Sequence, residues 1–134
     1  MVDASTIICI ILNEPEKAKI ISLTEEAEIA APEMISFEIG NALSRIVKKQ
    51  RLNEEQALKA YSLFESIPIR MVKVDMHRAL KISGKYKIYA YDAYYLEASH
   101  RIKLPLLTLD KGMKDKAKNM NVELVDLSSV EVPQ

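Results

Sequence analysis

The sequence has little cysteine, glycine, proline and aromatic residue, and it has no tryptophan. A single cysteine cannot form a disulfide within the chain, so Cys9 is expected to be a small buried hydrophobe. Three glycines and five prolines, scattered singly, leave no flexible linker and no low-complexity segment. Residues 1–134 are therefore expected to form a single domain.

The sequence also has no excess of charge of either sign and no long apolar run. The 19 Lys and Arg residues balance the 19 Asp and Glu residues, so the formal net charge is zero. No bulk positive field marks the chain as a nucleic-acid binder, although a local patch or a bound cation can serve the same purpose. The apolar run from Ile7 to Leu12 is too short to cross a bilayer and follows no basic segment. We therefore expect a cytoplasmic protein without membrane contact.

The sequence does contain an alternation of short strand patterns and helix patterns. Strands are expected at residues 1–3, 28–31, 69–74, 106–108 and 122–125, and helices at residues 5–12, 13–27, 33–49, 53–66, 75–83, 91–101 and 111–119. Ser5 is expected to cap the first helix. Helices between successive strands favour parallel pairing with right-handed crossovers. The pattern predicts an α/β fold of three layers, α/β/α, around a central parallel sheet of about five strands.

Four acidic residues stand in unusual contexts. Asp3 ends the first expected strand directly before an apolar run, and Glu38 interrupts the apolar pattern of its helix. Asp92 lies among tyrosines in a core-like segment, and Asp110 follows the strand at residues 106–108. Functional groups in parallel sheets gather beyond the carboxyl ends of the strands. We therefore expect these carboxylates to meet at one rim of the sheet, with Asp3 on the rim rather than buried.

Each acid also has a purely structural interpretation. Asp3 and Asp92 can cap or begin helices, Glu38 can pair with Arg45 or Lys48, and Asp110 can begin a turn. As a group, however, the acids would repel one another, because two like unit charges about 4 Å apart cost about 4 kcal/mol at an effective dielectric constant near 20. Such a cleft needs raised pKa values or a cation. Oxygen ligands without nearby His or Cys favour Mg²⁺ or Mn²⁺, which indicates hydrolysis of a phosphodiester bond.

Four short segments, in order, resemble the motifs of PIN-domain ribonucleases and in particular of VapC-type toxins. They are VDAS at residues 2–5, E-x-x-NAL at 38–43, YDAYYLEAS at 91–99 and TLDK at 108–111. The resemblance implies a metal-dependent endoribonuclease, the toxin of a toxin–antitoxin pair, with a small antitoxin protein as partner and a homodimeric assembly. It also implies a site: the catalytic and metal-binding residues are Asp3, Glu38, Asp92 and Asp110, supported by Ser5, Asn41 and Thr108.

The stretch GKYKIYAY at residues 84–91 mixes basic and aromatic residues directly before Asp92. Stacking on unpaired bases and Lys–phosphate contacts are the usual means of holding single-stranded RNA. In the alternative interpretation, the tyrosines pack on the sheet and the lysines are simply solvated. If part of this stretch is functional, Lys85 and Lys87 are expected near the mouth of the site, in contact with RNA.

Three other functions are alternatives to the toxin. One is a stand-alone PIN-domain nuclease that processes or degrades RNA without an antitoxin. Another is a catalytically silent PIN-like binding module. Nothing in the sequence favours it, because all four acids are intact. The third is a phospho-signalling receiver domain, which needs adjacent acids after the first strand; Asp3 has no acidic neighbour, and this function is rejected.

Overall fold

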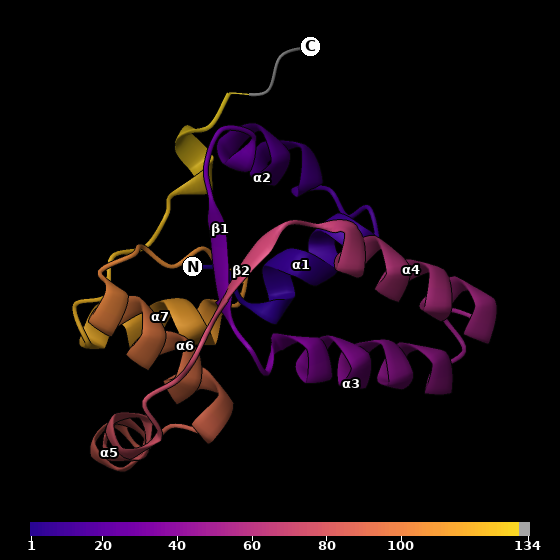
Figure 1. Ribbon diagram of the computed structural model, residues 1–134. Helices are drawn as coiled ribbons and strands as arrows, with labels where there is room; N and C mark the ends of the chain where they lie inside the picture. Colours follow the sequence, from indigo (N-terminus) through magenta and orange to yellow (C-terminus); the bar gives the residue numbers. More distant parts are fainter. Residues whose placement is uncertain (132–134) are drawn as a thin grey trace.

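The computed structural model describes residues 1–131 and shows helices on both sides of a short, twisted pair of strands (Figure 1). The elements in these residues are, in order, α1 (Ala4–Ile11), α2 (Lys17–Thr24), β1 (Ile29–Pro32), α3 (Ile35–Lys48), α4 (Glu54–Ser66), β2 (Ile69–Val72), α5 (Met76–Tyr86), α6 (Ala90–Ile102), α7 (Lys111–Asn119) and the 3₁₀ helix η1 (Leu127–Ser129). No helix among these residues is long and apolar enough to span a membrane. The α/β class and the parallel pairing are as predicted.

The sheet is smaller than the sequence predicts. Only β1 and β2 form regular strands within residues 1–131, and they pair in parallel with Ile29 opposite Ile69. The expectation of about five strands is therefore wrong. The other three segments form no regular strand and are linked by isolated parallel bridges, Val2 to Leu107 and Leu106 to Leu124.

These segments stay short because their neighbours interrupt them. The first segment ends when α1 begins at Ala4, immediately after Asp3. The segment at residues 106–108 lies between Pro105, which has no N–H to donate, and Asp110, which caps α7. A bridge needs only one or two residues, so pairing survives where a regular strand does not.

The five segments nevertheless run side by side in a definite order. Val2 donates its N–H to the carbonyl oxygen of Ala30 at 2.9 Å, which places the first segment beside β1. The bridges then add residues 106–108 and residues 122–125 on the other side of it. The spatial order is thus β2, β1, first segment, residues 106–108 and residues 122–125. The direction of winding reverses between the first segment and residues 106–108, and crevices for ligands open at such points beyond the carboxyl ends of the strands.

The helices pack apolar faces against this sheet from both sides. Figure 1 shows α1, α3 and α4 on one side of the strands and α5, α6 and α7 on the other. Along α3 the residues that face the core are Ile35, Ile39 and Leu43, four residues apart as one stripe of a helix requires. Leu96 of α6 and Leu106 have no exposed surface and close the core between the two sides.

Local signals explain most helix boundaries. Asn53 caps α4 through a capping box with Gln56, and Asp75 caps α5, as the sequence predicts. Helix α5 continues to Tyr86, beyond its expected end, and stops where Lys87 adopts a left-handed conformation with φ of 54°. The cap of α1 is Asp3 rather than Ser5, because the carboxylate accepts the N–H of Thr6.

Candidate functional site

The four acids come from the N-terminal ends of four helices. Asp3 caps α1 and Asp110 caps α7, whereas Glu38 and Asp92 lie in the first turns of α3 and α6. All four line one pocket of about 350 Å³, here called the acid pocket, together with Ser5, Arg45 and Tyr95 among others. The positive ends of the helix dipoles partly offset the repulsion among the carboxylates. The structure thus brings together the four side chains that the sequence predicts to converge.

Asp3 is buried, contrary to the expectation of a rim residue. Its side chain lies beyond the carboxyl end of the first segment, but only 4% of the residue is exposed. One carboxylate oxygen accepts the Ser5 hydroxyl at 2.6 Å and the N–H of Thr6 at 3.2 Å, and the other accepts the hydroxyl of Thr108. The burial of this acid is tolerated because hydroxyl and amide donors surround it.

Two features of the environment of Asp3 shift the pKa of its carboxyl in opposite directions. Burial raises the pKa of the Asp3 carboxyl above its ordinary value, while the hydrogen bonds from Ser5, Thr108 and Thr6 lower it again. Burial is the larger effect, so the ionised carboxylate is less favourable in the folded protein than in water. A cation in the acid pocket would stabilise the ionised form.

Glu38 is held by a residue that the sequence analysis missed. The Tyr95 hydroxyl donates to a Glu38 carboxylate oxygen at 2.6 Å. Burial, followed by the charges of Asp3 and Asp92, raises the pKa of Glu38, and the hydrogen bond from Tyr95 and the charge of Arg45 oppose the rise. The spacing in the sequence could have indicated Tyr95, because it lies three residues after Asp92 and hence on the same side of α6.

Asp92 has a cationic partner that was also missed. The Lys116 ammonium donates to an Asp92 carboxylate oxygen at 2.6 Å, which joins α7 to α6. This contact raises the pKa of the Lys116 ammonium, and the nearby negative charges of Asp92 and Asp110 act in the same direction. Nothing local in the sequence marks Lys116, because it lies 24 residues from Asp92.

The supporting residues divide into two groups. Ser5 and Thr108 contact Asp3 directly, and their hydroxyl oxygens also accept the backbone N–H groups of Leu109 and Asp110 at 2.9 and 3.1 Å. These bonds fix the loop that carries Asp110 to the loop that carries Asp3. Asn41, in contrast, is exposed on α3 and does not line the acid pocket.

The two lysines expected near the mouth of the site are not part of the acid pocket itself. Neither Lys85 nor Lys87 lines the acid pocket. Lys85 instead lines a separate hollow of about 290 Å³, here called the basic pocket. Its lining residues are Arg78, Lys81, Ile82, Lys85, Tyr86, His100 and Met120. The basic pocket combines cationic side chains with an aromatic ring and no acid, a combination that suits nucleic acid.

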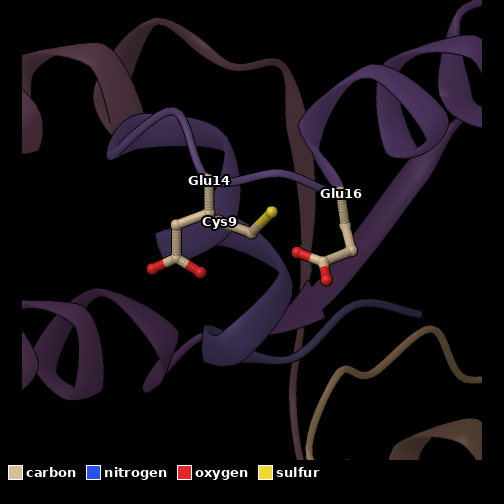
Figure 2. Close-up of side chains that lie close together, drawn as sticks. All are labelled: Cys9, Glu14 and Glu16. Carbon is tan, nitrogen blue, oxygen red and sulfur yellow. The ribbon is translucent and has the colours of Figure 1, made fainter.

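A second group of possible metal ligands lies at the end of α1. Figure 2 shows the Cys9 sulfur near the carboxylates of Glu14 and Glu16, with one ligand atom from each within 4.8 Å of the others. Within residues 1–131 no other group of three such residues comes as close, so the oxygens of the acid pocket are more widely spaced. Burial and the two glutamate charges raise the pKa of the Cys9 thiol, so the thiolate, which is the form that binds metal, is less favourable here than in water. Cys9 is buried, as the sequence predicts.

Comparisons with known proteins agree with this fold. Residues 1–119 match the sequence profile of the PIN domain. A protein described as ribonuclease VapC3, from Pyrobaculum aerophilum, is 23% identical over 121 residues, which cover 87% of this chain and 92% of the relative. The crystal structure of PAE2754, also from Pyrobaculum aerophilum, superposes with a TM-score of 0.71 at 21% identity, covering 96% of this chain and 90% of that one.

Proposed function

Because this chain belongs to the PIN domain family, we propose that it is a metal-dependent endoribonuclease that hydrolyses RNA phosphodiester bonds as the toxin of a toxin–antitoxin pair. The observation that carries the proposal is the acid pocket, in which the N-terminal ends of four helices present Asp3, Glu38, Asp92 and Asp110 to one cavity. The similarity to a ribonuclease of the VapC type supports the same class of reaction.

The donor set of the acid pocket suits Mg²⁺ or Mn²⁺. All four charged candidates are carboxylates, and neither His nor Cys lines the pocket. Their wide spacing is compatible with Mg²⁺, which binds through one or two carboxylates and keeps several waters. The raised pKa values of Asp3 and Glu38 also favour a cation, because a positive charge stabilises both ionised groups. When bound, a divalent ion supplies Lewis-acid stabilisation of charge on the reacting phosphate.

The chain's own residues hold the carboxylates in place for this reaction. Ser5 and Thr108 donate to different oxygens of Asp3 and so fix the plane of its carboxylate. Tyr95 fixes Glu38 in the same way from the opposite helix. Such outer hydrogen bonds commonly change metal affinity or activity by about 10- to 100-fold. These three hydroxyl residues are therefore positioning residues.

Cleavage of a defined single-stranded RNA with and without EDTA tests the proposal. We expect cleavage to require Mg²⁺ or Mn²⁺. The variants Asp3→Asn, Glu38→Gln, Asp92→Asn and Asp110→Asn should each lose more than about 100-fold in rate, since even outer partners of metal ligands contribute up to that amount. Circular dichroism should show that they remain folded. Activity that persists in excess EDTA, or two variants that cleave like the parent, would contradict the assignment.

The partner that we propose is a small antitoxin with an apolar helix and a basic residue. The apolar helix would pack beside α3 and α4, where Phe37 is 77% exposed and Leu58 is 63% exposed. An Arg would enter the acid pocket, since its planar fork can pair bidentately with a carboxylate. Co-expression with a neighbouring short gene, followed by purification and a cleavage assay, should yield a complex that cleaves RNA more slowly than the free protein.

The absence of such a gene would favour the stand-alone nuclease over the toxin. The silent binding module would instead be indicated by RNA binding without any metal-dependent cleavage. We also propose a homodimer, supported by further exposed apolar side chains between Glu16 and Phe64, namely Ile21 of α2 and Leu63 of α4. Light scattering that shows a monomer at high micromolar concentration would contradict it.

A further inference from the structure

Lys116 brings a positive charge to the acid pocket. Its ammonium lies 2.6 Å from an Asp92 carboxylate oxygen, and this is one of two ion pairs found within residues 1–131. The other pair, between Arg101 and Glu97, lies away from the pocket lining. Within residues 1–131, Lys116 is therefore the cationic residue that forms an ion pair with a carboxylate of the acid pocket.

The position of Lys116 on α7 explains how it reaches Asp92. Helix α7 begins at the cap Asp110, so one short helix delivers both an acid and a cation to the same region. The side chain of Lys116 is 31% exposed and that of Asp92 is 22% exposed, so solvent reaches both partners. A lysine ammonium on a flexible four-carbon stem can leave such a contact and return to water without a change in the backbone.

We propose that Lys116 occupies the place of a cation on Asp92, that a divalent ion displaces it, and that Lys116 thereby weakens the affinity of the acid pocket for metal. This inference rests on the proposed metal-dependent function. The Lys116 ammonium contacts only Oδ2 of Asp92, so an ion that binds either oxygen of this carboxylate meets a positive charge close by. Repulsion between the two positive charges weakens metal binding and favours release of Lys116 from Asp92.

Calorimetric titration with Mn²⁺ at low ionic strength tests this directly. We expect Lys116→Met to bind Mn²⁺ about two- to fivefold more tightly than the parent, the range expected when a solvent-exposed ion pair no longer competes. Lys116→Arg, which keeps the charge, should not gain affinity. Lys118→Met is the matched control, because Lys118 is exposed on the same helix, and it should bind Mn²⁺ like the parent. The gain should shrink as salt screens the competing charge.

Thermal melting supplies a second readout that does not depend on activity. Saturating Mn²⁺ should raise the melting temperature of Lys116→Met more than that of the parent, because stabilisation by a ligand grows with its affinity. Equal Mn²⁺ affinity in both proteins would overturn the inference and would make the contact a simple tie between α7 and α6. Weaker binding by Lys116→Met would also overturn it. If the parent binds no Mn²⁺, the proposed metal site is also wrong. This outcome differs from equal binding by both proteins, which would contradict only the role of Lys116.

Discussion

Asp3 shows how one residue can serve both a helix and a site. Its side chain caps α1 through the N–H of Thr6, and the same carboxylate lines the acid pocket. The structural and functional interpretations of this acid are therefore not exclusive. The cost of burying it is met by donors from two distant parts of the chain, since Thr108 lies 105 residues away in sequence.

Tyr95 provides a test of positioning at the residue scale. Tyr95→Phe removes the hydroxyl that donates to Glu38 but keeps the buried ring. We expect the free energy of unfolding to fall by about 1–3 kcal/mol, the usual cost of losing a hydrogen bond to a charged group. Mn²⁺ affinity should fall too, because Glu38 would no longer be held in one orientation. Urea denaturation and calorimetry measure the two effects.

Tyr94→Phe is the control for this prediction. Tyr94 is the neighbouring tyrosine on α6 and does not line the acid pocket. Equal stability and equal Mn²⁺ affinity for the two variants would show that the Tyr95 hydroxyl contributes nothing to the site.

Residue-scale prediction from the sequence succeeded for groups marked by local context and failed for contacts that depend on folding. The convergence of the four acids could be predicted because each breaks a local pattern, as Glu38 does in an apolar helix face. The burial of Asp3 was not found, because its donors include Thr108 on a distant segment. Lys116 was missed for the same reason, since an ordinary surface lysine and a lysine at an acid pocket have the same local sequence.

At the scale of elements, α5 carries a group of basic side chains that lies apart from the acid pocket. The helix contributes Arg78, Lys81 and Lys85 to the basic pocket, and α6 contributes His100, with the Arg78 guanidinium and His100 ring nitrogens 3.4 Å apart. Lys85 also lies 5.2 Å from the centre of the Tyr86 ring. A non-scissile RNA phosphate is the ligand that this arrangement would suit.

We therefore expect Lys85→Met to weaken RNA binding without changing Mn²⁺ affinity. The loss of one phosphate contact should reduce the slope of log affinity against log salt by about 1. Fluorescence anisotropy in an Asp110→Asn background prevents cleavage during the measurement. Lys59→Met on α4 is the control, and Lys87→Met tests whether the second lysine contributes. An unchanged salt slope for both Lys85 and Lys87 variants would leave them as solvated surface residues.

Helices were more predictable than strands for a physical reason. A helix carries its own hydrogen bonds and caps, so the signals at Asn53 and Asp75 suffice to locate α4 and α5. A strand depends on partners elsewhere in the chain. Residues 1–3, 106–108 and 122–125 have strand-like sequences, but capping acids and Pro105 leave room only for bridges.

At the scale of the whole molecule, the burial of Asp3 and Glu38 links stability to pH. Both pKa values are raised in the folded protein, whereas the unfolded chain titrates these groups near pH 4. Between that pH and the raised values, the folded state holds more protons than the unfolded chain. The free energy of unfolding contributed by these groups therefore decreases as pH rises through this interval and then levels off.

We expect metal-free protein to lose stability as pH rises from about 4 through the raised pKa values of the two acids. Asp3→Asn should flatten this dependence, because the amide does not titrate. Saturating Mn²⁺ should reduce or reverse it, because the ion favours the ionised carboxylates. Urea denaturation from acid to neutral pH, in EDTA and in Mn²⁺, measures all three. The same slope in Asp3→Asn as in the parent would show that Asp3 does not contribute.

The caps of α1 and α7 have a consequence for sequence drift. Asn caps a helix about as well as Asp, and it has nearly the same shape. A copy of this chain that exchanges Asp3 or Asp110 for Asn would keep both helices and the apolar surface of α3 and α4, while the proposed metal site would lose a carboxylate. Such a copy would compete with the active protein for the same partner. A conserved fold in descendants of this chain would therefore not show that they are active. Their activity would depend on whether a few side chains are carboxylates or amides.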